Sequence, residues 1–167
     1  MIVIADTTPL NHLILIEQID LLQVLYGRVI VPQAVLSELQ AQATPPKVKA
    51  WISKRPAWLE VNRTVLVTDP GLARLDPSEH DAIVLAQELG ADLLLMDDLG
   101  GRQEAVRRNL KVAGTLTVLY LAARRGLAQD FPATIEHLRR TGFRASSEII
   151  QLFLDRYAKA MNQPPPA

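Results

Sequence analysis

The sequence predicts an α/β fold with three layers, α/β/α, around a central, mainly parallel sheet of four to five short strands. Short apolar runs rich in β-branched residues recur along the chain, and segments with helical spacing of apolar residues lie between them. Strands that alternate with helices favour a parallel sheet between helical layers. Two of the apolar runs end in acidic residues, at the strand ends where open α/β sheets carry their sites.

The first ten residues contain the clearest of these runs. Ile2, Val3 and Ile4 lead to Asp6, which predicts a strand buried on both faces with a carboxylate at its carboxyl end. Asp6 is followed by Thr-Thr-Pro, which is also typical of a helix start where the acid or a threonine only caps. The sequence leaves both roles of Asp6 open.

Helical segments and a second strand follow. Residues 10–25 are rich in Leu and Ile at helical spacing and predict one or two short helices that end at Gly27. Residues 28–31 predict a strand and 33–40 the next helix, with a proline between them that suits a first helical turn. Glu38 adjoins the apolar stripe of that helix, so its carboxylate can point along the sheet edge. A lone Glu on a helix is, however, more typical of a solvated surface.

The middle of the chain predicts a short basic helix over residues 47–54, an edge strand over 58–61 and a loop through 69–71. A helix with clear start signals then begins at Pro77, with Asp76 as the expected N-cap.

Two acids, Glu79 and Asp81, lie near the start of this helix. Acids there complement the positive end of the helix dipole, and that role alone explains both. Asp81 also adjoins the core stripe of the helix, so its side chain can project over the rim of the sheet. Gly90 is expected to end the helix.

Residues 91–96 repeat the design of the first strand and end in Asp97 and Asp98. Two adjacent carboxylates at the end of a buried strand repel each other, which raises the pKa of at least one of them unless a cation lies near. A turn or helix cap explains one of the two, but hardly the doublet.

The remaining expected elements are a helix over about 100–109, a strand over 111–113, and helices over 116–125, 132–140 and 146–161. We expect a single domain over residues 1–161, with a core over about 1–127 and C-terminal helices over about 130–161. The Pro-rich residues 162–167 are expected to be disordered.

Composition narrows the class of protein. The chain has 167 residues, enough for one domain with a full core, and no cysteine, which excludes a disulfide framework or a thiolate zinc site. It has no apolar run of membrane-spanning length and no basic start typical of a signal peptide, so we expect a cytoplasmic protein with no membrane partner. Because 18 basic residues balance 18 acidic ones, binding to nucleic acid would depend on local patches, at 47–55, 102–111, 124–125 and 139–144.

The acids point to a divalent cation. In the predicted fold, Asp6 and the Asp97/Asp98 pair follow strands that end at the same edge of the sheet. Asp81 lies at the start of the helix that leads into the second of these strands, and a suitable loop conformation would bring it to the same edge. Carboxylates gathered without Lys or His partners cannot stay ionised in a dry site, so they call for Mg²⁺ or Mn²⁺. One or two such ions can hydrolyse a phosphodiester by activating water and stabilising the leaving oxygen.

Other catalytic patterns are missing from the sequence. It contains no Ser-His-Asp set, no glycine-rich phosphate loop and no zinc motif. The three histidines are isolated and are typical of structural or surface positions: His12, His80 and His137.

The ordered motifs resemble those of PIN-domain ribonucleases, in particular the prokaryotic PIN-like branch related to VapC-type toxins. The motifs are IADTTPL from Ile4, VP and VLSEL from Val31, SEHDAIVLA from Ser78, and LLMDD from Leu94 with Arg102. They fall in residues 1–127, and the helices after Asp130 lie outside the likeness.

The resemblance implies a metal-dependent endoribonuclease, often the toxin of a type II toxin–antitoxin pair. Its implied partners are RNA, an antitoxin protein and a second copy of the chain, and its implied cofactor is Mg²⁺ or Mn²⁺. The acids that would hold the metal and carry catalysis are Asp6, Glu38, Asp81 and Asp98, with Asp97 as the alternative to Asp98. The auxiliary residues would be Glu79, Asp97, Thr7, Thr8, Thr115 and Arg102. The threonines would hydrogen-bond carboxylates or metal-bound waters, and Arg102 would contact the scissile phosphate or tether an acid.

Two positions depart from the family pattern. Related toxins commonly carry Thr or Ser where Met96 lies if Asp98 is the acid that ends the strand, so the choice between Asp97 and Asp98 stays open. The branch tends to carry Gly-Glu followed by a second Glu, whereas this chain has Ser78-Glu79 and then Asp81.

Two other functions compete with the nuclease. Phosphoryl transfer through an aspartyl-phosphate would require a second Asp where Thr8 lies, or a Lys where Gly114-Thr115 lie. A non-catalytic interaction module would not need the four acids, all of which are present.

Overall fold

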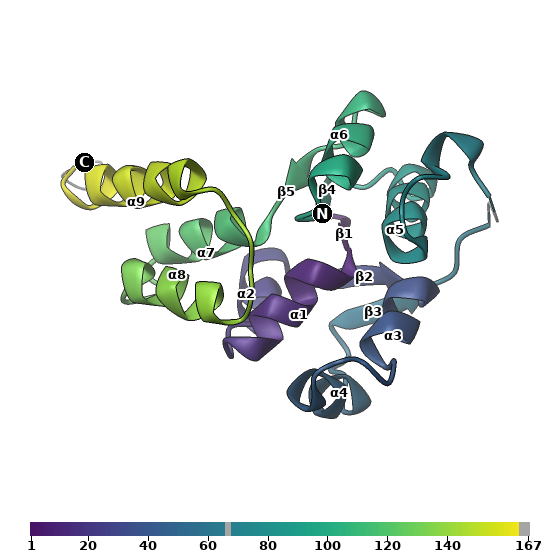
Figure 1. Cartoon of the computed structure of the whole chain (residues 1–167), viewed down its shortest axis with the longest axis horizontal. Coiled ribbons are helices and arrows are strands. Elements are labelled where there is room, and N and C mark those ends of the chain that lie inside the picture. Colours follow the sequence, from purple (N-terminus) through teal and green to yellow (C-terminus); the bar gives the residue numbers. More distant parts are fainter. Residues whose placement is uncertain (66–67, 164–167) are drawn as a thin grey trace. The chain divides into compact units, whose positions relative to one another are not determined.

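The computed structural model describes residues 1–65 and 68–163 of the chain (Figure 1). The chain divides into two compact units, Met1–Thr115 and a second unit that begins at Leu116. The single domain expected over 1–161 stays a prediction. The disorder expected for 162–167 falls, from residue 164 on, outside the described residues.

The first unit contains a parallel sheet of five strands in the order β3-β2-β1-β4-β5. The strands are β1 (Val3–Ala5), β2 (Val29–Pro32), β3 (Leu59–Asn62), β4 (Leu93–Leu95) and β5 (Val112–Ala113). The predicted parallel sheet is confirmed, and the third strand lies at an edge as expected.

Helices connect and cover these strands. They are α1 (Thr7–Leu15), α2 (Leu21–Tyr26), α3 (Gln33–Leu39), α4 (Pro46–Ser53), α5 (Pro77–Glu88), α6 (Leu99–Arg107) and the short 3₁₀ helix η1 (Pro70–Leu72). Figure 1 shows α1 and α2 on one side of β1 and β2 and α5 on the other, as right-handed crossovers in a parallel sheet require. The three-layer α/β/α architecture is therefore confirmed.

The turn expected at residues 69–71 contains η1. Asp69 Oδ1 accepts the Gly71 N–H at 2.9 Å and so caps this turn. The Asp69 carboxylate also accepts a 2.6 Å hydrogen bond from Arg108, 39 positions away in the sequence. This long-range ion pair anchors η1 to the end of α6, and local sequence carries no sign of it.

The core lies between β1 and α5. Ile4, Ile30 and Leu94 belong to one buried cluster with the apolar stripe of α5, which includes Ala82 and Leu85. Burial of each large aliphatic side chain of this kind contributes about 1.5–3 kcal/mol. The cluster fixes the start of α5 close to the carboxyl end of β1.

The second unit contains α7 (Thr115–Arg124), whose first residue belongs to the first unit, α8 (Phe131–Arg140) and α9 (Ser147–Met161). Asp130 and Ser146 cap α8 and α9 through their side chains, so the predicted helix starts are confirmed within one residue. Four rings pack with centroids 5.1–6.1 Å apart: Tyr120, Phe131, Phe153 and Tyr157.

In the described part of the chain, no helix combines the length and the apolar character that crossing a membrane requires.

Candidate functional site

The sheet extends in opposite directions from the neighbouring strands β1 and β4. Chain connections run from β1 toward β2 on one side and from β4 toward β5 on the other, so the β1–β4 gap is a topological switch point. Ala5 lies opposite Leu95, and the Asp6 N–H donates to the Leu95 carbonyl at 2.9 Å. Asp6 therefore lies level with the end of β4, in the position where ligands bind in open α/β sheets.

Asp6 is held at this edge with one of its two side-chain oxygens unpaired. It occupies the N-cap position of α1 but makes no side-chain capping bond, which disfavours the capping interpretation. Its side chain is 2% exposed, and its Oδ1 is buried with no hydrogen-bond partner among the described residues. Burial raises the pKa of Asp6 well above its usual value. A hydrogen bond from the Thr7 backbone lowers it in part, and the charges of Asp76, Glu79 and Glu38 raise it further.

Glu38 reaches the same edge from α3. Its Oε2 accepts a 2.8 Å hydrogen bond from Thr7 Oγ1 and a short one from Ser78 Oγ. The Thr7 contact is of the kind that the sequence predicts. Ser78 was not predicted, and it is only 3% exposed. It lies four residues before Ala82, on the core stripe of α5, so a hydroxyl at that position signals a buried partner.

The start of α5 brings Glu79 into the same group of acids. Asp76 accepts the Glu79 N–H at 2.9 Å and Glu79 accepts the Asp76 N–H at 3.4 Å, so the two residues form a capping box. Burial raises the pKa of Glu79 to about 7, with further contributions from the charges of Asp76 and Asp98. The electrostatic neighbours of Asp6 thus include Glu79, and those of Glu79 include Asp98.

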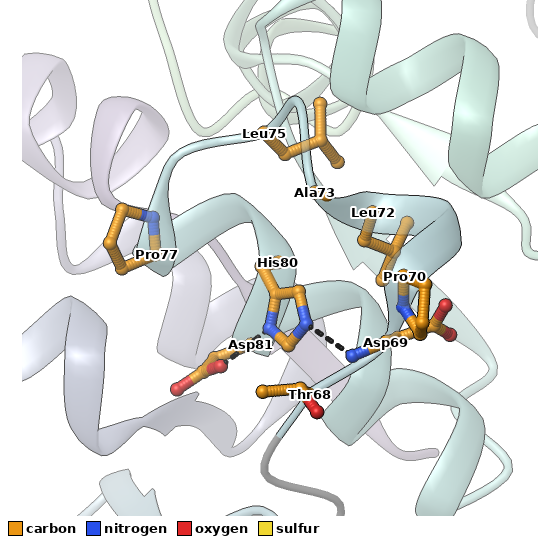
Figure 2. A pocket seen from close by; sticks show the side chains of 9 residues that line it. All are labelled: Thr68, Asp69, Pro70, Leu72, Ala73, Leu75, Pro77, His80 and Asp81. Carbon is orange, nitrogen blue, oxygen red and sulfur yellow. Dashed lines mark hydrogen bonds and ion pairs between the residues drawn. The ribbon is translucent and has the colours of Figure 1, made fainter.

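Asp81 lies in a different place, a pocket beside η1 (Figure 2). His80 Nε2 accepts the Asp69 backbone N–H at 3.0 Å, so the ring proton lies on Nδ1, which donates to Asp81 Oδ1 at 2.8 Å. The pocket has a volume of about 370 Å³ and is lined by Thr68, Asp69, Pro70, Leu72, Ala73, Leu75, Pro77, His80 and Asp81. In this structure the Asp81 carboxylate is therefore hydrogen-bonded to His80 and not to a residue of the Asp6 group.

The two acids after β4 also separate. Asp97 accepts two hydrogen bonds from Thr115, at 2.8 Å from its N–H and 2.6 Å from its Oγ1. Asp98 caps α6 by accepting the Gly101 N–H at 2.9 Å. Burial raises the pKa of Asp97, while the Thr115 bonds and the charges of His12 and Arg102 lower it. The predicted rise in pKa is present for Asp97, but its main cause is burial and not the neighbouring carboxylate of Asp98.

Arg102 lies beside Asp97, just after β4. Its Nη1 donates to the Met96 carbonyl at 3.1 Å, and its charge lowers the pKa of Asp97. A Cβ at Gly114 would lie 2.7 Å from both Arg102 Nη1 and Asp97 Oδ1, so a larger residue there would displace the ends of these two side chains. Thr8, in the first turn of α1, donates no hydrogen bond to a carboxylate in the part of the chain that the structure describes.

The acids at the switch point form a wide group rather than a closed metal cage. Within residues 1–65 and 68–163, no three His, Asp or Glu side chains are close enough together to hold a metal ion. The donor set is nonetheless all oxygen, and Asp6 Oδ1 is a buried acceptor without a donor. Mg²⁺ usually keeps several of its waters and uses only one or two protein carboxylates. The residues at this edge therefore fit a hydrated divalent cation.

Comparison with known families agrees with this architecture. The sequence model of the DUF3368 family, a PIN domain, matches residues 2–159. The chain belongs to the PIN-domain family. PIN domains are generally nucleases and typically bind divalent metals. The match confirms the resemblance of the motifs. It also extends through α8 and most of α9, so the expectation that the helices after Asp130 lie outside the likeness is wrong. No curated protein and no solved structure matches the chain.

Proposed function

We propose that this PIN domain is a Mg²⁺- or Mn²⁺-dependent endoribonuclease that hydrolyses RNA phosphodiesters. The observation that carries the proposal is the Asp6 carboxylate, buried at the switch point with an unpartnered Oδ1 and a raised pKa. An acid in this state is stabilised by a nearby cation, which compensates the cost of its burial.

The acids proposed to hold the cation are Asp6, Glu38, Glu79 and Asp98. Thr7 and Ser78 occupy only one oxygen of Glu38, which leaves Oε1 for a cation or its waters. Glu79 takes the place expected for Asp81, because its charge acts on Asp6 whereas Asp81 is bonded to His80. The role predicted for Asp81 stays a prediction that requires its carboxylate to leave His80.

Asp97 is proposed as a positioning residue. Thr115 occupies both of its oxygens, and Arg102 and Gly114 pack against it. The geometry thus favours Asp98 over Asp97 as the ligand after β4. When bound, the cation supplies an activated water and neutralises charge on the reacting phosphate. The chain's own contribution is to hold the acids in place and to exclude bulk water from Asp6.

The likeness of the motifs to VapC-type toxins supports a more specific proposal. In it, the chain is the toxin of a type II toxin–antitoxin pair, acts in the cytoplasm, binds an antitoxin protein and forms a homodimer. Phosphorylation of Asp6 is disfavoured, because Thr8 and Gly114-Thr115 lie where that chemistry would require a second Asp or a Lys.

A cleavage assay tests the nuclease directly. A panel of labelled single-stranded RNAs is incubated with Mn²⁺ and the wild-type chain, Asp6→Asn or Asp20→Asn. Asp20 is a matched control, since it is exposed at the start of α2 and makes no side-chain capping bond. We expect a loss of at least ~100-fold for Asp6→Asn, equivalent to about 2.7 kcal/mol, and little change for Asp20→Asn. Undiminished cleavage by Asp6→Asn would overturn the proposal.

A further inference from the structure

Three basic side chains of the second unit surround one hollow. Arg124 comes from α7, and Arg156 and Lys159 come from α9, where they are three positions apart and share a helix face. The hollow has a volume of about 330 Å³ and is completed by Tyr120, Ala160 and Gln163. The Arg124 guanidinium lies 6.0 Å from the centre of the Tyr120 ring, one turn before it on α7. We call these three cations and their lining the α7–α9 basic hollow.

The three cations are not neutralised within the protein. All three side chains are exposed, and in the described part of the chain none of them forms an ion pair. Other basic residues do form ion pairs, among them Arg28, Lys47, Arg108 and Arg140. Asp155, next to Arg156 in sequence, accepts a 2.8 Å hydrogen bond from Gln151 one turn earlier. The hollow is therefore a local concentration of positive charge in a chain whose net charge is zero.

We propose that the α7–α9 basic hollow binds RNA phosphates, an inference that rests on the proposed nuclease function. The candidate site is lined by acids, among them Asp6, Glu79 and Asp98, which repel a phosphate backbone. The balanced net charge supplies no long-range attraction to compensate. Affinity for RNA must then come from cations elsewhere on the chain that lack a protein partner, and the hollow brings three of them together.

The lining favours RNA over an acidic protein as the occupant. Arginine donates paired N–H groups that match phosphate oxygens, and the Arg124 guanidinium lies within cation–π range of the Tyr120 ring, at 6.0 Å. Protein interfaces are centred on buried apolar or aromatic anchors. Around this hollow only Tyr120 and Ala160 are apolar in character, and Tyr120 already packs against Phe131 and Phe153.

RNA binding is measured by fluorescence anisotropy with a labelled 20-nucleotide RNA, over a series of KCl concentrations, in EDTA so that no cleavage occurs. The wild-type chain is compared with Arg124→Gln/Arg156→Gln/Lys159→Gln. A matched control removes three other exposed cations of the same unit: Arg125→Gln/Arg139→Gln/Arg144→Gln. Circular dichroism melting confirms that each variant is folded.

We expect the hollow variant to bind RNA at least tenfold more weakly at 100 mM KCl. We also expect its slope of log K against log salt to be smaller by about 2, because each phosphate contact to a single strand contributes about 0.7. The control variant should change less in both respects. Equal losses in the two variants, or wild-type affinity in the hollow variant, would overturn the inference. So would binding of poly-glutamate, but not RNA, in a manner that depends on these three cations.

Hydrolysis of bis(p-nitrophenyl) phosphate by the wild-type chain with Mn²⁺ is measured alongside. Absence of this hydrolysis would count against the nuclease and leave the RNA-binding result standing. If the chain hydrolyses this substrate but the hollow variant binds RNA as the wild type does, only the inference about the α7–α9 basic hollow is overturned.

Discussion

Asp81 Oδ1 lies 2.8 Å from His80 Nδ1, and this contact separates Asp81 from the other acid at the start of α5, Glu79. Residues two positions apart on an α-helix point in directions that differ by about 200°. In this conformation the two acids therefore have different neighbours. Glu79 belongs to the group that includes Asp6, and Asp81 belongs to the pocket beside η1 (Figure 2).

The two acids should thus differ in their effect on catalysis. Glu79→Gln is expected to lower Mn²⁺-dependent RNA cleavage by about 30-fold or more, or about 2 kcal/mol, because it removes an acid beside Asp6. Asp81→Asn is expected to cost far less, since it alters a contact with His80. Cleavage rates of the two variants under identical conditions decide the matter. Equal losses would show that Asp81 leaves His80 to join the cation.

The raised pKa values predict how stability depends on pH. The folded pKa of Glu79 is about 7 against an ordinary 4.5, and that of Asp6 is raised as well, so the folded chain binds protons more tightly than the unfolded chain. Without divalent cations, this lowers the free energy of unfolding as pH rises from about 4.5 to 7. Glu79→Gln should remove about 1 kcal/mol of that fall, a value reduced by solvent screening at this half-exposed side chain. Urea unfolding of the wild-type chain and of Glu79→Gln at pH 4.5 and pH 8 measures this fall in the free energy of unfolding. An equal fall in the two proteins would contradict the prediction.

Divalent cations should stabilise the wild-type chain at neutral pH. Mn²⁺ at about 100 times its Kd would raise the free energy of unfolding by about 2.7 kcal/mol, which corresponds to several degrees in Tm. In Asp6→Asn this increase should be lost, because the buried carboxylate at the switch point is gone. Thermal melting of both proteins with Mn²⁺ and with EDTA provides the comparison, with Asp20→Asn as a control that should respond like wild type.

The sequence predicts the scaffold well because the scaffold depends on local patterns. The apolar runs before Asp6 and Asp97 are strands, and the Asp76-Pro77 start of α5 is a capped helix, as propensity and capping rules indicate. These signals also place the two strand ends at one edge, which brings Asp6 and the Asp97/Asp98 pair together.

The direction of individual side chains depends on contacts that the sequence does not show. Asp81 accepts a hydrogen bond from His80 because the backbone N–H of Asp69, eleven residues earlier, fixes the tautomer of the ring. Both oxygens of Asp97 accept hydrogen bonds from Thr115, 18 residues later. This leaves Asp98 as the acid whose charge acts on Glu79. Such long-range bonds set which of two neighbouring acids is free to act in the proposed site.

Ser78 provides a final test of how the site is built, because it touches an acid proposed to hold the cation without itself holding one. Its hydroxyl donates to Glu38 Oε2 from a buried position on α5. Ser78→Ala should weaken Mn²⁺ binding by about tenfold, since residues that orient metal ligands typically contribute 10–100-fold to affinity. Ser53→Ala, which removes an exposed hydroxyl bonded only to the Ala50 carbonyl, is the matched control. Isothermal titration with Mn²⁺ distinguishes this role from a purely structural one: a variant that melts at a lower temperature yet binds Mn²⁺ as wild type does would show that Ser78 supports only the packing of α5.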